Sequence, residues 1–309
     1  MIIAGLDIGG TKCAALLANA CEDSVTFLER SQIETKGTWH EILDNLCAKI
    51  KEFETRHGVK AQAVGISCGG PLSSKLGVIM SPPNLPGWDE VPVNAYVAER
   101  LGLTKELVRL KNDADACAVA EWKYGAGKGT RNMIFLTFGT GLGAGLVLNG
   151  ALYSGTNDMA GEAGHIRLEK SGPTGYGKAG SFEGFCSGGG IAQLSEKYFE
   201  QKLTAKQVAC LAQEGNDKAL DLYREVGAAL GRGLSVLIDL LNPQKIVLGG
   251  IYMRSHELMT EKMYRELEKE CLPQSLAAVE ILPSQLGERI GDYGAITAAV
   301  CDIGNPNAR

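Results

Sequence analysis

The chain has 309 residues, of which 45% are hydrophobic, and it carries a formal net charge of −5. This length corresponds to about two domains, and the hydrophobic content is sufficient for a core in each. The acidic balance argues against a nucleic-acid partner. No uncharged apolar stretch of about 18 residues occurs, and Asp7 interrupts the first apolar run, so we expect neither a membrane span nor a signal peptide.

The nine cysteines are odd in number, scattered along the chain, and never form a Cys-x-x-Cys pair. Such spacing is typical of reduced thiols in a cytosolic protein rather than of a disulfide framework. We therefore expect a cytoplasmic location and no membrane partner.

The first predicted elements are strands near residues 2–7, 12–19 and 24–30, with a glycine turn between the first two. This turn lies in Ala4-Gly-Leu-Asp-Ile-Gly-Gly-Thr-Lys12. Glycines reach positive φ and let backbone N–H groups converge on a phosphate, and Asp7 beside them can hold Mg²⁺. A tight hairpin also favours glycine for structural reasons alone, so the turn by itself leaves both interpretations open.

A helix is predicted over roughly residues 38–56, because apolar residues recur there at helical spacing. A buried strand at residues 63–67 then leads into Cys68-Gly-Gly-Pro71, and a loop rich in turn residues covers residues 81–88.

The next predicted strand, Leu107–Lys111, ends at Asn112-Asp113, where a helix begins that runs to about Lys123. Open α/β sheets bind ligands at the carboxyl ends of their strands. Asp113 could therefore accept the proton of a sugar hydroxyl during phosphate transfer, while Asn112 holds a neighbouring hydroxyl. The alternative is an N-cap, in which these side chains satisfy the first N–H groups of the helix. The two roles can coexist.

The second half of the chain opens in the same way, with strands predicted at residues 133–138, 143–149 and 151–154 and a Gly/Thr turn between the first two. At a separation of 132 positions, Asp7–Thr11 aligns with Gly139–Gly143. The chain thus resembles two related halves, each opening with a glycine-turned hairpin, and two such turns favour a kinase. A dinucleotide fingerprint is excluded, because a strand and not a helix follows the glycines.

Gly161-Glu-Ala-Gly-His-Ile166 brings Glu162 and His165 within three residues of each other. A carboxylate and an imidazole at this spacing could bind two neighbouring hydroxyls of a sugar. The alternative is a structural histidine whose hydrogen bonds are satisfied within the protein.

A long Gly-rich region follows and is predicted to be irregular. Within it, Gly172–Ala179 nearly matches a P-loop, but Ala179 stands where Ser or Thr would have to bind magnesium. We therefore interpret this segment as a loop.

The longest predicted helix covers about residues 216–241 and is stopped by Pro243. A buried strand, Lys245–Leu248, then enters Gly249-Gly250, and a last helix is predicted at about Asp292–Cys301. Strand triplets that alternate with helices predict a mixed α/β sheet in each domain.

The ordered set of motifs resembles the ROK family of bacterial sugar kinases and repressors over essentially the whole chain. The motifs are Asp7-Ile-Gly-Gly-Thr-Lys12, Asn112-Asp113-Ala, Gly139-Thr-Gly-Leu-Gly143, Gly161-Glu-Ala-Gly-His165, Glu183 and Val247-Leu-Gly-Gly250. The resemblance implies two actin-like, ribonuclease-H-like α/β domains around a central cleft. We expect the smaller domain to comprise residues 1–115 and about 291–309, and the larger one residues 116–290.

The resemblance also implies roles for individual residues. Asp113 would be the catalytic base, and the sugar-binding residues would be Gly70, Asn84, Asn112, Asp113, Glu162, His165 and Glu183. Residues around ATP would be Asp7, Gly9, Gly10, Thr11, Lys12, Thr137, Gly139, Thr140, Gly141, Gly249 and Gly250, with Asp7 as the Mg²⁺ ligand.

One departure from the family concerns zinc. Many members carry a Cys-x-Cys-Gly-x-x-Gly-Cys-x-Glu segment that binds structural zinc, but here Thr174, Tyr176 and Ser181 stand at the cysteine positions. None of them can act as a zinc thiolate. We expect no zinc site, and a segment held by packing and hydrogen bonds.

A second departure concerns the repressors, which carry a DNA-binding segment before the region that resembles a kinase. The glycine turn here starts at residue 7, which leaves no room for one. We therefore expect an ATP-dependent sugar kinase that acts on glucose O6, with N-acetylmannosamine or fructose as alternative acceptors, and a homodimer by resemblance. A non-catalytic sugar sensor is the alternative from another class, although a sensor would need neither Asp7 nor Asp113.

Overall fold

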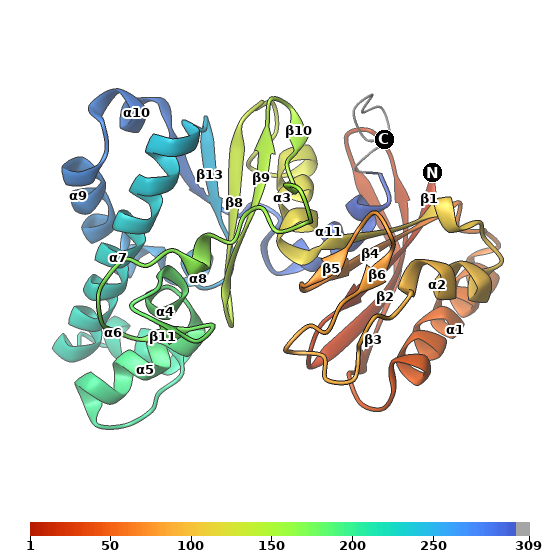
Figure 1. Ribbon diagram of the computed structural model, residues 1–309, viewed down its shortest axis with the longest axis horizontal. Coiled ribbons are helices and arrows are strands. Elements are labelled where there is room, and N and C mark those ends of the chain that lie inside the picture. The colour runs from red at the N-terminus through yellow and green to blue at the C-terminus, as the bar shows by residue number, and fades with distance from the viewer. Residues whose placement is uncertain (301–309) are drawn as a thin grey trace. The chain divides into compact units, whose positions relative to one another are not determined.

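The computed structural model describes residues 1–300, and the chain divides into two compact units. The first unit contains Met1–Gly129, Ala151–Ala160 and the described residues from Glu288 onward; the second contains Thr130–Gly150 and Gly161–Gly287. The chain forms two five-stranded sheets with helices against them, so the fold class is mixed α/β as predicted (Figure 1). Each sheet is built from one unit, except that the edge strand at residues 151 and 152 of the second sheet is grouped with the first unit. The predicted boundary at residues 115 and 116 falls inside a helix that lies wholly in the first unit.

The sheet of the first unit has the strand order β3-β2-β1-β4-β7. Its strands are β1 (Ile2–Ile8), β2 (Lys12–Ala20), β3 (Val25–Glu34), β4 (Ala63–Cys68) and β7 (Val108–Asn112). The first three form an antiparallel meander, whereas β1, β4 and β7 run parallel. The short strands β5 (Leu72–Ser73) and β6 (Val78–Ile79) form a separate hairpin.

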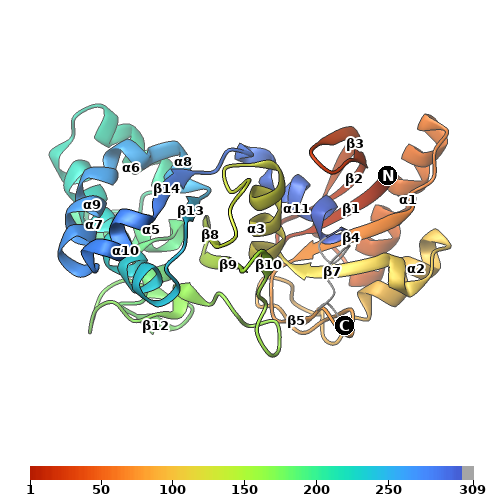
Figure 2. The same cartoon turned by 90° about the horizontal axis from the view of Figure 1, so that it is seen from above.

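Helices cover both faces of this sheet. They are α1 (Trp39–His57), α2 (Val93–Leu101), the 3-10 turn η1 (Lys105–Leu107), α3 (Asp113–Tyr124) and α11 (Ile290–Ala298). In β1, Leu6 and Ile8 belong to the core on the α1 and α2 side, whereas Ile3 belongs to the core under α11 (Figure 2). This division follows from the two-residue period of a strand.

Helix α11 lies unusually close to the sheet. A Cβ atom added to Gly65 of β4 would lie 2.0 Å from the carbonyl oxygen of Ala295, so no larger residue fits there. The start of the helix is fixed by Arg30 of β3, whose Nε donates to both carboxylate oxygens of the buried Asp292, at 2.9 and 3.1 Å. Helix α11, the last helix among the described residues, is therefore an integral part of the first unit. Its predicted end at Cys301 lies outside the described residues.

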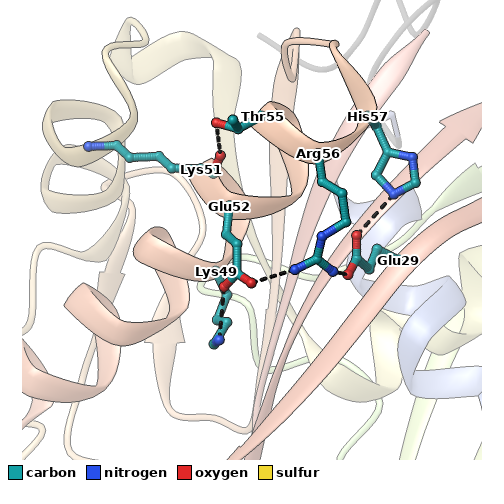
Figure 3. A network of polar contacts seen from close by, with 7 residues as sticks. All are labelled: Glu29, Lys49, Lys51, Glu52, Thr55, Arg56 and His57. Carbon is teal, nitrogen blue, oxygen red and sulfur yellow. Dashed lines mark hydrogen bonds and ion pairs between the residues drawn. The ribbon is translucent and has the colours of Figure 1, made fainter.

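Helix α1 has strong end signals. Thr38 and Glu41 form a reciprocal capping box, and Gly58 ends the helix in the left-handed conformation. At its carboxyl end, Arg56 and His57 both reach Glu29 on β3, the latter with 2.9 Å between His57 Nε2 and Glu29 Oε2 (Figure 3). These contacts attach the end of the helix to the edge strand of the sheet.

The second five-stranded sheet repeats the order of the first, as β10-β9-β8-β13-β14. Its strands are β8 (Met133–Phe138), β9 (Leu142–Leu148), β10 (Ala151–Leu152), β13 (Lys245–Leu248) and β14 (Glu280–Pro283). Strands β8 and β9 are antiparallel, and β8, β13 and β14 run parallel. In both sheets, the first strand of an antiparallel hairpin is followed across the sheet by two strands that run parallel to it. This is the mixed α/β sheet that was predicted for each domain.

The remaining elements of the second unit are mostly helical. They are η2 (Ala163–His165), β11 (Thr174–Gly175), β12 (Lys178–Ala179), α4 (Phe182–Phe185), α5 (Gly188–Phe199), α6 (Ala205–Gln213), α7 (Asp217–Leu241), α8 (Ile251–Ser255), η3 (His256–Leu258), α9 (Thr260–Glu270) and α10 (Pro273–Ala278); η4 (Gly287–Arg289) leads out of the unit. The longest, α7, is capped by Asn216 and ends before Pro243, as predicted. Within residues 1–300, no helix is long and apolar enough to cross a membrane.

The Gly-rich region, which was predicted to be irregular and to be followed by helices, contributes its last glycines to a helix. Helix α5 starts with three glycines, and Ser187 caps it by accepting the Gly190 N–H at 3.0 Å. A Cβ on Gly190 would lie 1.7 Å from the Gly184 carbonyl oxygen, so this glycine permits tight packing and does not interrupt the helix.

Candidate functional site

Three parallel strands of the first unit end side by side. Ile8 at the end of β1 is in register with Cys68 of β4, and Cys68 is in register with Asn112 of β7. The residues that follow these strand ends therefore meet along one edge of the sheet, which is where open α/β sheets bind ligands. Gly9 and Asp113, which were both predicted to be site residues, are among them.

The loop that carries Asn84 packs onto this edge. A Cβ on Gly10 would lie 2.5 Å from the Asn84 carbonyl oxygen, so the first glycine turn and the loop are in direct contact. The Asn84 side chain lies near Gly69, with its Nδ2 atom 3.6 Å from the ideal Cβ position of that residue. Gly70 lies in turn near Asn112, whose Nδ2 is 3.3 Å from the ideal Cβ position of Gly70. The structure thus brings the predicted sugar-binding residues of the first unit together.

Asn112 and Asp113 combine the two roles considered for them. Asn112 is the N-cap of α3, and its Oδ1 accepts the Ala114 N–H at 2.9 Å, which leaves its Nδ2 directed toward Gly70. Asp113 Oδ1 accepts the same N–H at 2.8 Å, while its Oδ2 lies on the side of Gly69. The helix start therefore orients both side chains and leaves one polar atom of each for a ligand.

Burial of its carboxyl group raises the pKa of Asp113, and backbone N–H groups at the helix start oppose the rise. The residue nevertheless keeps an exposed surface, so water still reaches it and limits the effect. A carboxylate with a raised pKa is a stronger base, which is the property that a proton acceptor needs.

Asp7 of β1 lies next to this group on the α11 side of the sheet. Burial, followed by the charges of Asp113 and Asp292, raises the pKa of Asp7 to about 6, and Arg30 opposes the rise. A Cβ on Gly291, in the first turn of α11, would be 3.0 Å from Asp7 Oδ2, so the carboxylate rests against the helix start. Ser67 is its in-register neighbour on β4.

These residues fit a magnesium ion. Mg²⁺ usually keeps several waters and needs only one or two protein carboxylates when substrate phosphates supply other oxygens. Asp7 offers one carboxylate. The Ser67 hydroxyl is buried and makes no hydrogen bond of normal length and angle among residues 1–300. It faces Asp7 closely enough that a weak hydrogen bond to the carboxylate lowers the pKa of that carboxyl. A hydrated cation beside Asp7 would give the hydroxyl a partner.

The first glycine turn is fastened from behind by Thr35, which directly follows β3. Its hydroxyl donates to the Gly9 carbonyl at 2.7 Å, and its N–H donates to the Thr11 carbonyl at 2.9 Å. The Cys13 thiol lies 3.2 Å from the Thr35 hydroxyl. These contacts occupy the carbonyl groups of the turn, while Thr11 and Lys12 remain exposed at its front.

The second glycine turn joins β8 and β9 and has the same length as the first. Strand ends at Ile8 and Phe138 correspond, so the two turns superpose at an offset of 130 positions and not at the 132 taken from the sequence. At this offset Thr137 takes the place of Asp7. Its hydroxyl accepts the Gly143 N–H at 2.9 Å across the hairpin.

Gly249 and Gly250 lie against this second turn. The Gly249 N–H donates to the Leu136 carbonyl at 2.9 Å, and a Cβ on Gly250 would lie 2.1 Å from the Phe138 carbonyl oxygen. On the other side, the Gly188 N–H at the start of α5 donates to the Gly139 carbonyl at 2.8 Å. A Cβ on the next residue, Gly189, would lie 3.7 Å from the Thr140 carbonyl oxygen, so the predicted nucleotide residues of the second unit form one group.

Glu183 of α4 also reaches the second turn. Its Oε2 accepts the Leu142 N–H at 3.0 Å, and a Cβ on Gly141 would lie 2.6 Å from the same oxygen. Gly164 of η2 is adjacent, because a Cβ there would lie 3.2 Å from Glu183 Cβ. Glu162 and His165 flank this glycine, and the His165 N–H donates to the Glu162 carbonyl at 3.1 Å. The predicted sugar-binding residues of the second unit therefore lie on neighbouring segments.

The segment without the family cysteines is held by hydrogen bonds. Thr174 belongs to the β11–β12 hairpin, and its N–H and carbonyl both bond to the Gln193 side chain, at 2.8 and 2.9 Å. Ser181 caps α4 through the Gly184 N–H, and Tyr176 is exposed. Within residues 1–300, no three His, Cys, Asp or Glu side chains gather into a metal-binding group.

Sequence reasoning missed several residues that shape the site. Thr35, Ser67 and Gly291 are far from the motifs in sequence, and only strand pairing or helix docking brings them close. Gly188 and Gly189 were missed as well. For these the Ser187-Gly-Gly-Gly run was an available signal, because serine followed by glycines can open a helix against a phosphate turn.

Comparison with known proteins identifies the family of the chain. The model of the ROK family matches residues 3–300. A glucokinase of Halalkalibacterium halodurans is 31% identical and covers 94% of this chain and 92% of its own. An N-acetyl-D-glucosamine kinase of Salmonella typhimurium is 30% identical, with 96% and 97% covered.

Among solved structures, a ROK family glucokinase from Streptomyces griseus in complex with glucose and AMPPNP is 28% identical. It aligns with a TM-score of 0.79 over 96% of this chain and 98% of that one. The family match, the relatives and the shared actin-like architecture lead to one conclusion: the chain belongs to the ROK family.

Proposed function

We propose that this chain is an ATP-dependent hexose kinase that transfers the γ-phosphate to a sugar hydroxyl, with glucose O6 as the preferred acceptor. The glucokinase and N-acetyl-D-glucosamine kinase relatives support a sugar kinase. The observation that carries the proposal is the placement of Asp113: the start of α3 holds one carboxylate oxygen, and the other is directed toward Gly69 beside Asn84.

In this proposal Asp113 accepts the proton of the sugar hydroxyl as phosphate transfer proceeds. Asn112 and Asn84 hold neighbouring hydroxyls through the side-chain atoms that face Gly70 and Gly69. Because α3 fixes Asp113 before the sugar arrives, little reorientation is needed for proton transfer.

Glu162, His165 and Glu183 are proposed as the contribution of the second unit to sugar binding. One oxygen of Glu183 already accepts the Leu142 N–H, so its other oxygen is the one left for a hydroxyl. We expect these three residues to decide between glucose and N-acetylated hexoses, since the relatives include kinases for both.

The two glycine turns are proposed to bind the polyphosphate of ATP, with Gly249 and Gly250 against adenosine. A bound Mg²⁺ would neutralise charge that develops on the phosphates. Asp7 would hold that cation, Lys12 would add a positive charge at the first turn, and Thr140 and the turn amides would donate to phosphate oxygens. Thr137 would support the second turn, because its hydroxyl bonds to Gly143 across the hairpin. We also expect a homodimer, which sedimentation equilibrium would test.

The experiment is an ADP-release assay on a hexose panel that includes glucose, N-acetylglucosamine, N-acetylmannosamine and fructose. We expect turnover with glucose, and Asp113→Asn should lower kcat by about 10² or more while sugar binding persists. Asp115→Asn is the matched control, because it makes the same charge change on the same helix at a residue bonded to Ser154. Binding without turnover on any sugar would instead identify a sensor.

A further inference from the structure

Ser67 is a buried residue whose hydroxyl is unsatisfied. It lies in β4 of the first sheet, is 1% exposed, and its Oγ makes no hydrogen bond of normal length and angle among the described residues, although a weak bond to Asp7 lowers the pKa of that carboxyl. Leaving a polar group buried and unpaired costs about 1–3 kcal/mol, and few such groups persist in native proteins. The hydroxyl is therefore expected to have a partner that joins the protein when it works.

The position of Ser67 indicates what this partner is. Ser67 and Asp7 are paired in register on the parallel strands β4 and β1. Their neighbours along the strands, Ile66 and Cys68 on β4, belong to the core on the α1 side. Because side chains alternate along a strand, Ser67 and Asp7 both point to the opposite face, about 5 Å apart at Cβ.

The surroundings restrict how Asp7 can respond. Oδ2 of Asp7 lies 3.0 Å from the ideal Cβ position of Gly291, and Oδ1 lies 4.0 Å from it. The helix therefore limits the movement of the carboxylate on one side. A ligand of Asp7 must approach from another side, where the neighbouring strand contributes the Ser67 hydroxyl.

We propose that Ser67 is a positioning residue for the divalent cation of the phosphoryl transfer. Its hydroxyl oxygen accepts a hydrogen bond from a water of the cation's hydration shell, while Asp7 supplies the negative charge. This inference rests on the proposed function, because a kinase needs the cation and a sensor does not. The alternative is that Ser67 is merely a small residue that permits close packing under α11.

The two explanations predict different cation affinities for Ser67→Ala. If Ser67 is only a spacer, removal of an unpaired hydroxyl changes nothing but stability. If it holds a cation-bound water, the variant is as stable as the original protein or more so, because an unsatisfied group is gone, yet it binds the cation about tenfold more weakly.

The test is a titration with Mn²⁺, followed by the electron paramagnetic resonance signal of free Mn²⁺, in the presence of AMPPNP. We expect Ser67→Ala to raise the dissociation constant of Mn²⁺ about tenfold with an unchanged or higher Tm. Ser67→Cys is nearly isosteric and a poor acceptor, so it should show a similar loss and carries the test if the alanine variant does not fold.

Cys68→Ala is the matched control: it lies on the same strand, removes one heavy atom, and faces the opposite core. It should lower Tm and leave Mn²⁺ binding within about twofold, well below the effect of an outer-shell loss. Unchanged Mn²⁺ affinity in both Ser67 variants would overturn the inference. Turnover by the unaltered chain on the hexose panel separates this outcome from a failure of the proposed kinase activity.

Discussion

The two glycine turns of this chain share a backbone and differ in chemistry. Each joins two antiparallel strands through three residues, and each lies beside a parallel strand that ends in a glycine pair, at Gly69-Gly70 or Gly249-Gly250. The first turn follows an acidic residue, Asp7, whereas the second follows Thr137, whose hydroxyl is used within its own hairpin. The two turns therefore share a backbone arrangement, but the first follows a charged residue and the second follows an uncharged one.

The supports of the two turns differ as well. Behind the first turn, Thr35 donates hydrogen bonds to two carbonyl groups, and the Asn84 loop packs so closely that it leaves no room for a side chain at Gly10. Beside the second, Glu183 accepts a turn N–H, and Gly139 has no neighbouring heavy atom within 4 Å of its ideal Cβ position in the described part of the chain. The first turn is therefore tightly enclosed, and the second is open at its first residue.

The largest effect should come from Asp7→Asn. The amide cannot supply charge to a cation, so we expect kcat at saturating Mg²⁺ to fall by about 10². Thr137→Val, at the equivalent position of the second turn, should cost only a few-fold, since it removes hydrogen bonds internal to a hairpin. Equal losses in the two variants, measured by ADP release, would contradict the division of charge between the turns.

A smaller effect is expected when alanine replaces one glycine in each turn: Gly10 in the enclosed first turn and Gly139 in the open second turn. Gly10→Ala places a methyl group 2.5 Å from a backbone oxygen, and we expect a loss of about 2–3 kcal/mol, seen as a lower Tm. Gly139→Ala meets no described atom and should leave Tm nearly unchanged, while raising KM for ATP because the methyl group enters the space proposed for phosphate. If both variants melt alike, the turns do not differ in enclosure.

A further effect is expected in the first unit, where the buried Asp115 of α3 makes stability depend on pH. Burial raises the pKa of Asp115 to about 6, although the Ser154 hydroxyl donates to it at 2.8 Å. Between about pH 4 and pH 6 the folded chain retains a proton that the unfolded chain has lost, so this group lowers stability as pH rises through that window.

Asp115→Asn removes this effect, and we expect it to raise stability at pH 8 by about 1–2 kcal/mol, since each unit of pKa corresponds to about 1.4 kcal/mol. The decline in Tm from pH 4 to pH 6 should become shallower by calorimetry. Asp221→Asn, on the exposed face of α7, is the control and should leave the profile as it is. If the Asp115→Asn variant shows the same dependence of Tm on pH as the original protein, groups other than Asp115 cause that dependence.

The smallest effect concerns the bond that fastens the first turn. Thr35→Val keeps the shape of the side chain and loses the donor to the Gly9 carbonyl, which should cost about 1 kcal/mol. Thr35→Ser retains the donor and should restore most of the loss. If serine does not restore Tm and KM for ATP, packing rather than this hydrogen bond holds the turn.

Sequence reasoning located the elements whose signals are local. Helix α1 has a capping box and apolar residues at helical spacing, and α7 is bounded by Asn216 and Pro243. Helix α2 was missed, because its N-cap position is Pro92 and carries no side-chain cap. The start of α5 was missed although Ser187 followed by glycines was an available signal; the contact with the Gly184 carbonyl that requires glycine at residue 190 is tertiary.

The residues of the candidate site likewise fall into two groups, those with a local sequence signal and those without one. Asp7, Asn112 and Asp113 follow directly from strand ends and motifs, and the structure groups them. Ser67 and Gly291 act through distant partners, because one is defined by strand register and the other by a helix that returns from the end of the chain. The spacing of residues in the sequence reveals neither the strand register nor the docking of the helix.

The discontinuous path of the first unit affects how the protein is made. Its sheet is synthesised first, but the face that carries Ile3, Leu16 and Ala63 packs, within the described residues, against α11 and Ala299, far later in the chain. The second unit lies between them, so its residues must be translated before that cover exists. At ordinary rates of synthesis this interval is on the order of ten seconds. During it an apolar surface is exposed on the nascent chain, and the region begun first is the last to be completed.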